Sequence, residues 1–336
     1  MWYEAKGKDS DVAISTRVRI ARNLAGYPFG DRLDDEKKKE IIKKVDAAFP
    51  EGEWKYTDMA SLSEPARQSL ADRHLISREF ADWPEGTQLI QNKDEDVNIM
   101  VLEEDHVRIQ SIVPGFDIRS ALDKALGAES KLDENCDIAY SERYGYITHC
   151  PTNLGTGIRI SVMLHLPAYT RTGGVKALAL QLAKLGLTIR GADGEGSDAS
   201  GNLYQISNQV TLGVTEDELV ERLSNVIGKI IAEERSLHEK AGEQFTADLR
   251  EQARRNFGIL MYSERISSSE ITDMYSTLRL AASSGLIKLP QEKLDELLIR
   301  SMPHTVEAEH EGVNTPEARD RARAGLAREI LGGSDI

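Results

Sequence analysis

Apolar and polar residues alternate from position 11 to position 21, near the start of the chain. One parity is mostly apolar and comprises Val12, Ile14, Thr16, Val18 and Ile20. The other parity carries Ser15, Arg17 and Arg19. Successive side chains of a strand point to opposite faces, so this segment predicts a strand with two cations on one face, roughly 7 Å apart.

Further along the chain, helical and strand patterns follow one another without an internal repeat. Helices are predicted where apolar positions recur every three or four residues, over 34–50, 61–77 and 173–186. Strands are predicted over 97–112, over two segments within 146–166, and over 187–190 and 204–212. The two segments within 146–166 are joined by the turn CPTNLGTG at 150–157, and a glycine-rich loop runs from 191 to 202.

The last third of the chain has helical patterns only. Thr215 and Glu218 have the spacing of a capping box and open a long amphipathic helix. Strand patterns disappear from about Gly242, and a final helix is predicted with Thr315 as its N-cap and Pro316 in its first turn. We therefore expect a mixed α/β domain over residues 1–240 and a smaller all-helical domain over 241–336.

Charge and cysteine content narrow the possible partners. The 336 residues include 56 acidic and 42 basic side chains, for a net charge of −14. A field of this sign repels nucleic acids and anionic membranes, so we expect neither as a direct partner. Two cysteines, Cys136 and Cys150, are too few for a disulfide framework, and neither a signal peptide nor a membrane-spanning run is present. We expect a cytoplasmic protein.

Arginines recur in strands or at strand ends of four predicted segments: Arg17, Arg19, Arg108, Arg159 and Arg190. Taken singly, each is most simply a solvated surface residue. Guanidinium groups bind phosphate oxygens through two parallel hydrogen bonds, so several together favour a polyphosphate site. No GxxxxGK[ST] motif is present, and the site is therefore expected to lack a P-loop.

Acidic residues form a second candidate cluster. Glu104, His106 and Arg108 share one parity of the predicted strand, so a carboxylate and a cation can face the same site, and Glu195 lies in the glycine-rich loop. Two carboxylates that converge on a guanidinium could align it and accept its proton as it attacks phosphorus. Alternatively, EED is the solvated charge run of a hairpin turn, which fits Asp105 at its middle better than Glu104.

Cys150 follows His149 and precedes a turn rich in proline and glycine. Its thiolate could be a nucleophile, with His149 or His106 beside it, in a hydrolase or amidinotransferase that acts on guanidines. It could also contact a substrate, or be a buried structural cysteine. The residues alone leave these three interpretations open.

Four motifs resemble, in the same order, those of the phosphagen (guanidino) kinase family: STRVR, EEDHVR, CPTNLGTGIRISVM and RGADGEGSDASGNLYQISNQ. The similarity covers roughly residues 10–235, and that to the bacterial branch of the family, the protein-arginine kinases, covers essentially the whole chain. The resemblance implies an α+β fold, with a mainly antiparallel sheet flanked by helices and a C-terminal all-helical domain. It also implies ATP-dependent phosphorylation of arginine side chains in proteins.

The resemblance assigns roles to the residues that match. The five arginines would bind the phosphates of ATP. Glu104 would be the catalytic base, with Glu103 beside it and Glu195 as the second carboxylate, and Cys150 would touch the guanidinium without forming a covalent intermediate. The ATP site as a whole would comprise Ser15, Thr16, Arg17, Val18, Arg19, His74, Arg108, Arg159, Ile160, Ser161, Val162, Met163, Arg190, Gly191, Ala192, Asp193, Gly194 and Glu195.

Departures from the family pattern bear on the substrate and the metal. Family members that act on small molecules begin with a helical domain of about 100 residues, whereas this chain starts almost at the first catalytic strand. We therefore expect an open site that admits an arginine displayed on a protein. Asp193 replaces a further arginine of free-arginine kinases, and Met163 replaces an adenine-contacting histidine. Mg²⁺ would be held by phosphates and water, with no metal site made by the protein.

The segment RDRARA near the C-terminus matches a motif by which protein-arginine kinases bind phosphoarginine allosterically. Its residues are Arg319, Asp320, Arg323 and Ala324. The two arginines are one helical turn apart, so they can share a face and bind the phosphate. From spacing alone, the alternative is a surface helix with ion pairs. The resemblance further implies a homodimer, an activator protein and a partnership with a bacterial stress protease complex.

Two other functions remain open at this point. One is a phosphoarginine-binding adaptor that keeps a degenerate kinase fold, and the other is the guanidine-modifying enzyme that depends on Cys150. Nucleotide binding separates the kinase from the adaptor, and turnover without ATP would indicate the hydrolase.

Overall fold

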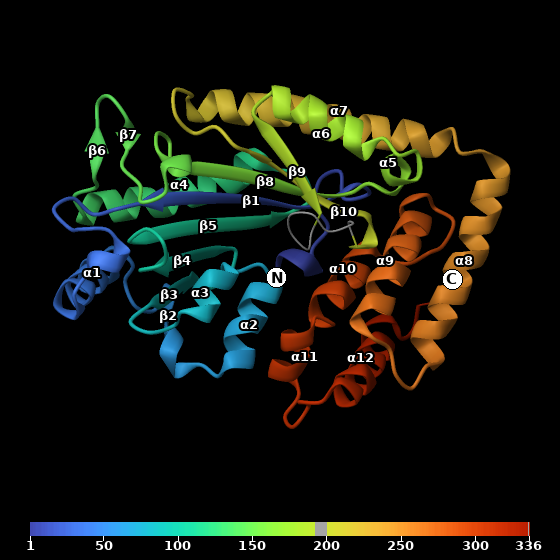
Figure 1. Cartoon of the computed structure of the whole chain (residues 1–336). Helices are drawn as coiled ribbons and strands as arrows, with labels where there is room; N and C mark the ends of the chain where they lie inside the picture. The colour runs from blue at the N-terminus through green and yellow to red at the C-terminus, as the bar shows by residue number, and fades with distance from the viewer. Residues whose placement is uncertain (192–199, 335) are drawn as a thin grey trace.

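An eight-stranded sheet forms the framework of the N-terminal two thirds of the chain (Figure 1). The computed structural model describes residues 1–191, 200–334 and 336. The strand order is β2-β3-β4-β5-β1-β8-β10-β9, with every neighbouring pair antiparallel. The bounds are β1 Ala13–Arg22, β2 Trp54–Asp58, β3 Gln88–Asn92, β4 Val97–Val101, β5 Val107–Pro114, β8 Ile158–His165, β9 Leu187–Gly191 and β10 Leu203–Asn208. A separate hairpin pairs β6, Tyr140–Ser141, with β7, Gly145–Tyr146.

Helices cover one face of the sheet and bury its apolar side chains. They are α1 Asp35–Ala48, α4 Ile118–Asn135, α6 Val175–Lys184 and α7 Glu216–Glu239, and α5 Pro167–Arg171 precedes α6. Val18, Ile109 and Ile160 of the central strands share one core with Leu122 of α4. Since side chains alternate along a strand, the opposite parity of the same strands points away from this core. On that side lie α2 Glu64–Asp72 and α3 Arg78–Asp82, below the sheet in Figure 1.

The C-terminal third is helical and has a core of its own. Its helices are α8 Gly242–Tyr262, α9 Ser268–Ser283, α10 Gln291–Arg300, α11 Pro303–Glu309 and α12 Pro316–Leu331. Leu278, Leu294 and Ala327 lie in this second core, which Trp2 of the N-terminal segment also joins. Figure 1 shows the helices beside the open side of the sheet, with α11 next to α2.

Two contacts fix the helical region to the rest of the chain. The fully buried guanidinium of Arg279 pairs with Asp295 at 3.0 Å and donates hydrogen bonds to the carbonyl oxygens of Ser10 and Asp11. A buried arginine tied in this way is costly to separate from its carboxylate. On the other side, α11 packs on α2, where the Ser69 hydroxyl donates to that of Thr305 at 3.3 Å.

The predicted α+β class, with an antiparallel sheet and a C-terminal helical region, is confirmed. Helix caps were predicted well, because the capping box at Thr215 and the N-cap at Thr315 both form. Three segments were predicted wrongly. Residues 97–112 form two strands with a turn between them, and the helix within 61–77 is only the shorter α2. The first of the two strands expected within 146–166 is the two-residue β7, which already ends at Tyr146. The prediction missed β2, β3 and α4 altogether.

Candidate active site

A cavity of about 910 Å³ opens on the face of the sheet that the four helices leave uncovered. Three arginines from three adjacent strands line it: Arg19 of β1, Arg108 of β5 and Arg159 of β8. The strand register brings them together, because Arg19 lies opposite Arg159, and Ala21 of β1 lies opposite Arg108. The alternation predicted for residues 11–21 directs Arg19 into the cavity, and the pairing of β1 with β5 and β8 places Arg108 and Arg159 beside it.

The guanidinium groups of Arg17, Arg19 and Arg159 crowd one another and form no ion pair with the described residues, whereas Arg108 is paired with two carboxylates. Burial, followed by the charges of Arg159 and Arg108, lowers the pKa of Arg17 to about 10. Burial and then Arg17 also lower the pKa of Arg19 well below its ordinary value. The Nε atoms of Arg19 and Arg159 are buried without a hydrogen-bond partner among the described residues. Buried cations with unused donors are costly unless an anion is present, so the geometry is that of an anion site.

Arg190 of β9 extends this cluster, since it lies opposite Gln205 of β10 and, after burial, contributes most to the lowered pKa of Arg159. Gln205 also accepts a hydrogen bond from Arg17 at 2.9 Å. Gly191 is the last residue of β9. The remaining loop residues expected at the ATP site, Ala192, Asp193, Gly194 and Glu195, lie outside the described residues.

A smaller recess on the same face brings together other residues of the expected ATP site. It is lined by Ser15, Arg17, His74, Ile112, Ser161, Met163 and Gln205. Burial, and then Arg17 and Arg78, lower the pKa of His74 to about 3, so the imidazole is neutral at physiological pH. A neutral ring in a recess that apolar Ile112 and Met163 also line suits an uncharged heterocycle better than a phosphate.

Four residues of the expected ATP site point the other way. The side chains of Val18, Ile160 and Val162 are fully buried in the core beneath the helices. The hydroxyl of Thr16 is buried as well and donates to the carbonyl oxygen of Gly115 at 2.7 Å. Strand alternation directs these four side chains away from the cavity, so only their backbone groups could face it, and their place in the ATP site stays a prediction.

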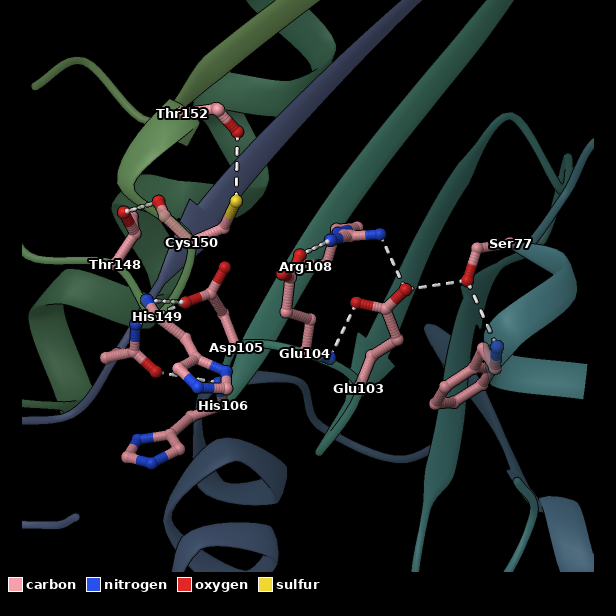
Figure 2. A network of polar contacts seen from close by, with 12 residues as sticks. Ser77, Glu103, Glu104, Asp105, His106, Arg108, Thr148, His149, Cys150 and Thr152 are labelled. Carbon is pink, nitrogen blue, oxygen red and sulfur yellow. Dashed lines mark hydrogen bonds and ion pairs between the residues drawn. The ribbon is translucent and has the colours of Figure 1, made fainter. Parts of the chain in front are cut away.

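Glu103 and Glu104 lie in the turn between β4 and β5, and both contact Arg108 (Figure 2). Arg108 donates from Nη1 to Oε1 of Glu103 at 2.5 Å and from Nη2 to Oε2 of Glu104 at 2.9 Å. The Glu103 side chain is 4% exposed, whereas that of Glu104 is 40% exposed. The predicted strand parity of Glu104, His106 and Arg108 is wrong, since the first two belong to the turn. A carboxylate and a cation nevertheless meet there.

Ser77 positions the buried carboxylate and was not predicted. Its hydroxyl donates to Oε1 of Glu103 at 2.7 Å and accepts from the backbone N–H of Phe80 at 3.2 Å, as the N-cap of α3. Figure 2 shows Ser77 on the side of Glu103 away from Cys150. A serine before an acidic first turn is a cap signal, but nothing local in the sequence connects it with Glu103.

Asp105 and His106 are buried structural residues of the same turn, so the alternative interpretation of EED as a solvated charge run does not hold for Asp105. Oδ1 of Asp105 accepts from the Asn23 side chain and from the backbone N–H of His149, both at 2.7 Å. The imidazole of His106 accepts from the Leu24 N–H at Nδ1 and bonds the Pro28 carbonyl oxygen through Nε2. The turn is thereby joined to the loop that carries Cys150.

Cys150 lines the main cavity on the side opposite Ser77. Its Sγ lies 3.0 Å from the hydroxyl of Thr152, and its carbonyl oxygen accepts from Thr148. The His149 ring stacks on Phe29, and both ring nitrogens of His106 already have partners. In the described part of the chain no imidazole is hydrogen-bonded to Cys150. The dyad that a cysteine hydrolase needs is therefore not formed here.

The RDRARA residues form ion pairs within the helical region. Arg319 of α12 pairs with Glu307 of α11. Arg323 is 3% exposed, pairs with Asp320 at 2.6 Å and donates to the carbonyl oxygen of Ser301, and Ala324 is fully buried. Arg319 is thus the more accessible of the two arginines.

Two general features concern metals and membranes. Over the described ranges, no group of three His, Cys, Asp or Glu side chains could hold a metal ion by itself. Within the same ranges, no helix is both long and apolar enough to cross a bilayer.

Family models match both parts of the chain. The ATP:guanido phosphotransferase C-terminal catalytic domain matches residues 36–237, and the protein-arginine kinase McsB C-terminal domain matches residues 246–335. A protein-arginine kinase of Desulforamulus reducens is 39% identical over 98% of this chain and 95% of its own length. The protein-arginine kinase of Bacillus subtilis is 37% identical over 98% and 93%.

Solved structures give the same picture of the fold. The duplicated taurocyamine kinase of Schistosoma mansoni superposes with a TM-score of 0.62 at 27% identity, over 75% of this chain and 40% of that one. A lombricine kinase superposes with a TM-score of 0.61 at 23% identity, over 70% of each chain. The second likeness concerns the fold alone.

Proposed function

Because the chain belongs to the ATP:guanido phosphotransferase family, in its protein-arginine kinase branch, we infer that it transfers the γ-phosphoryl group of ATP to arginine side chains of proteins. The arrangement around Arg108 supports the roles proposed for individual residues. This arginine holds two carboxylates and lies in one cavity with Arg19 and Arg159.

We propose that the arginine cluster binds the polyphosphate of ATP. Arg17, Arg19, Arg108, Arg159 and Arg190 would neutralise its charge and stabilise the charge that develops on the transferring phosphoryl group. The unused Nε donors of Arg19 and Arg159 support this assignment. The recess at His74 and Met163 has a volume of about 20 Å³ and would have to widen to take the adenine.

The substrate guanidinium would enter from the open side and meet the carboxylates. A guanidinium is cationic and a poor nucleophile until it gives up a proton. Glu104, the more exposed carboxylate, would accept that proton as a guanidinium nitrogen bonds to the γ-phosphorus and the bond to the β–γ bridging oxygen breaks. Glu103 and Glu195 would align the guanidinium, and Cys150 would contact it. Arg108 would turn from Glu104 to phosphate when ATP binds.

Mg²⁺ would arrive with ATP, held mainly by phosphate oxygens and water. The donors in the cavity fit this, since Glu103 and Glu104 are engaged by Arg108 and the other lining cations repel a metal. When bound, the ion would neutralise charge on the phosphates. The protein's own contribution would be to hold those phosphates with arginines.

The remaining assignments are proposals about regulation and organisation. Residues 1–240 would form the catalytic domain, and residues 241–336 would serve homodimerisation and phosphoarginine binding through Arg319, Asp320 and Arg323. We also propose that the protein is cytoplasmic and that an activator protein stimulates it. Its phosphorylation of other proteins would mark them for a stress protease. The ion pair of Arg319 with Glu307 supports a phosphate site, because phosphate could replace that carboxylate.

One assay tests the central proposal. The protein is incubated with Mg·ATP and an unfolded protein substrate, and modified residues are identified by mass spectrometry under non-acidic conditions. Acid-labile phosphoarginine on the substrate is the expected product. Phosphate on free arginine or creatine alone would refute the protein substrate, and phosphoarginine binding without nucleotide binding would indicate an adaptor.

A further inference from the structure

Trp83 is a large apolar side chain displayed at the rim of the catalytic cavity. It is 77% exposed and follows the last residue of α3. Its backbone N–H donates to the carbonyl oxygen of Glu79 at 3.1 Å, and Pro84 restricts the chain after it. The exposed indole is therefore carried by a backbone that is held in place, and α3 itself is tied to Glu103 through Ser77.

Trp83 separates the catalytic cavity from a second cavity of about 400 Å³. Trp83, Leu102 and Glu103 line both, so the two hollows share one wall. An extended chain advances about 3.3 Å per residue. A segment that places its arginine beside Glu103 and Glu104 and runs toward Trp83 would bring the side chain of a nearby residue to the second cavity.

The charges around the second cavity favour a cation. Its lining includes Asp82, Glu85 and Lys38, besides Glu103, whose charge Arg108 compensates. Among the described residues, the side chain of Asp82 accepts only from the neutral amide of Gln68, at 2.6 Å. Glu85 has no hydrogen-bond or ion-pair partner among the described residues. The cavity is thus lined by the incompletely paired carboxylates of Asp82 and Glu85 and by one ammonium group, that of Lys38. Trp83 lies beside them, and tryptophan is the aromatic side chain that binds cations best.

We propose that the second cavity is a subsite for a lysine or arginine lying within two positions of the target arginine in the protein substrate. The aliphatic stem of that residue lies on the Trp83 indole, and its cation lies near Asp82 and Glu85. An acidic residue at the same place meets like charge. The subsite rests on the proposed function and adds a preference among substrates: arginines in basic segments are phosphorylated before arginines in acidic ones.

The test compares kcat/KM for three series of peptides that differ at one position within two residues of a single arginine. That position holds lysine, glycine or glutamate, and phosphoarginine is quantified by mass spectrometry. Lysine is expected to exceed glycine by about 2- to 5-fold, the range of an exposed cation–π contact. Lysine should exceed glutamate by on the order of 10-fold, mainly through KM, because the contact does not change during the reaction.

Two variants and one control variant test which residues cause the preference for lysine near the target arginine. Trp83→Ala should reduce the advantage of lysine over glycine, and Glu85→Gln should narrow the gap between lysine and glutamate. Leu180→Ala removes another side chain that is 70% exposed, on α6, and should leave both ratios as in the wild type. Each ratio is measured within one enzyme, so a general loss of activity cancels.

The outcomes distinguish this subsite from the function on which it rests. Equal kcat/KM values for the three peptides in the wild type would overturn the subsite alone. Ratios that stay unchanged in both Trp83→Ala and Glu85→Gln would also overturn it. If the wild type formed no phosphoarginine on any peptide or unfolded protein, the proposed function would fail, and the subsite with it.

Discussion

Asp105 joins the carboxylate turn to the loop that carries Cys150, and its removal should separate them. The carboxyl group is 1% exposed, and its Oδ1 accepts from Asn23 and from the His149 N–H. Hydrogen bonds to a charged acceptor stabilise by about 1.5 kcal/mol each at the lower end of their range. The Asp105→Ala variant should therefore lose about 3 kcal/mol of unfolding free energy, measured by denaturant unfolding.

Catalysis should fall further than this loss of stability suggests. Misplacement of a reacting group by about 1 Å can cost on the order of 100-fold in rate. We expect Asp105→Ala to lower kcat for protein phosphorylation about 100-fold while KM for ATP changes little, because Arg17, Arg19 and Arg159 do not contact Asp105.

The conservative variant Asp105→Asn provides the matched control. Its amide oxygen can still accept both hydrogen bonds, although without a full charge, so it should retain more stability and kcat than Asp105→Ala. A wild-type kcat in a folded Asp105→Ala variant would refute the positioning role. Equal loss in both variants would mean that the charge, rather than the two hydrogen bonds, is what matters.

Three further predictions concern the proposed catalytic, phosphate and adenine groups. Glu104→Gln removes the proposed base and should lower kcat by about 10²- to 10⁴-fold, with ATP affinity retained in a calorimetric titration. Arg159→Ala should instead weaken ATP binding by about 10-fold or more, and an unchanged Kd would remove this residue from the phosphate site. The pKa of His74 is about 3 in the folded protein, below its unfolded value near 6.5. His74 therefore leaves the unfolding free energy unchanged above pH 6.5 and lowers it increasingly as the pH falls toward 3. His74→Gln should flatten that part of the stability profile in denaturant titrations, and an unaltered profile would contradict the neutral, buried ring.

Local pattern predicted those features that depend on one strand or one helix end. The alternation around Arg17 and Arg19 was sufficient to place both guanidinium groups on the open face of the sheet. The same alternation also shows why Val18 cannot reach ATP through its side chain, although the family motif includes it. A motif groups residues by sequence, whereas a strand distributes them over two faces.

Features that depend on distant contacts could not be predicted in this way. Oδ1 of the buried Asp105 carboxylate accepts from Asn23, 82 positions earlier, and from the His149 backbone, whereas its Oδ2 has no hydrogen-bond partner among the described residues. The contact of Ser77 with Glu103 could not be predicted either, because the two residues belong to different elements that only the folded chain brings together. Helix α4, by contrast, could have been predicted from the sequence, because its buried residues Ile118, Leu122 and Ala125 have helical spacing. β3 is buried on both faces and has no alternation to detect.

A chain of packed elements connects the proposed phosphoarginine site with the proposed adenine recess. Arg319 pairs with Glu307 on α11, which packs on α2 through Thr305 and through the backbone N–H of His304 bonded to Asp72. Just beyond the end of α2, His74 enters the recess with a left-handed backbone, φ +59°.

Contiguous packing alone does not make two sites interact, because coupling requires an element with two arrangements that both ligands favour differently. Such a coupling would have to pass through α11, a helix of seven residues, because it contacts both Arg319 and α2. One side of α11 touches α2, and the other carries the carboxylate that phosphate would displace from Arg319. A ligand at Arg319 would therefore act on adenine binding by releasing Glu307 rather than by adding a contact near ATP.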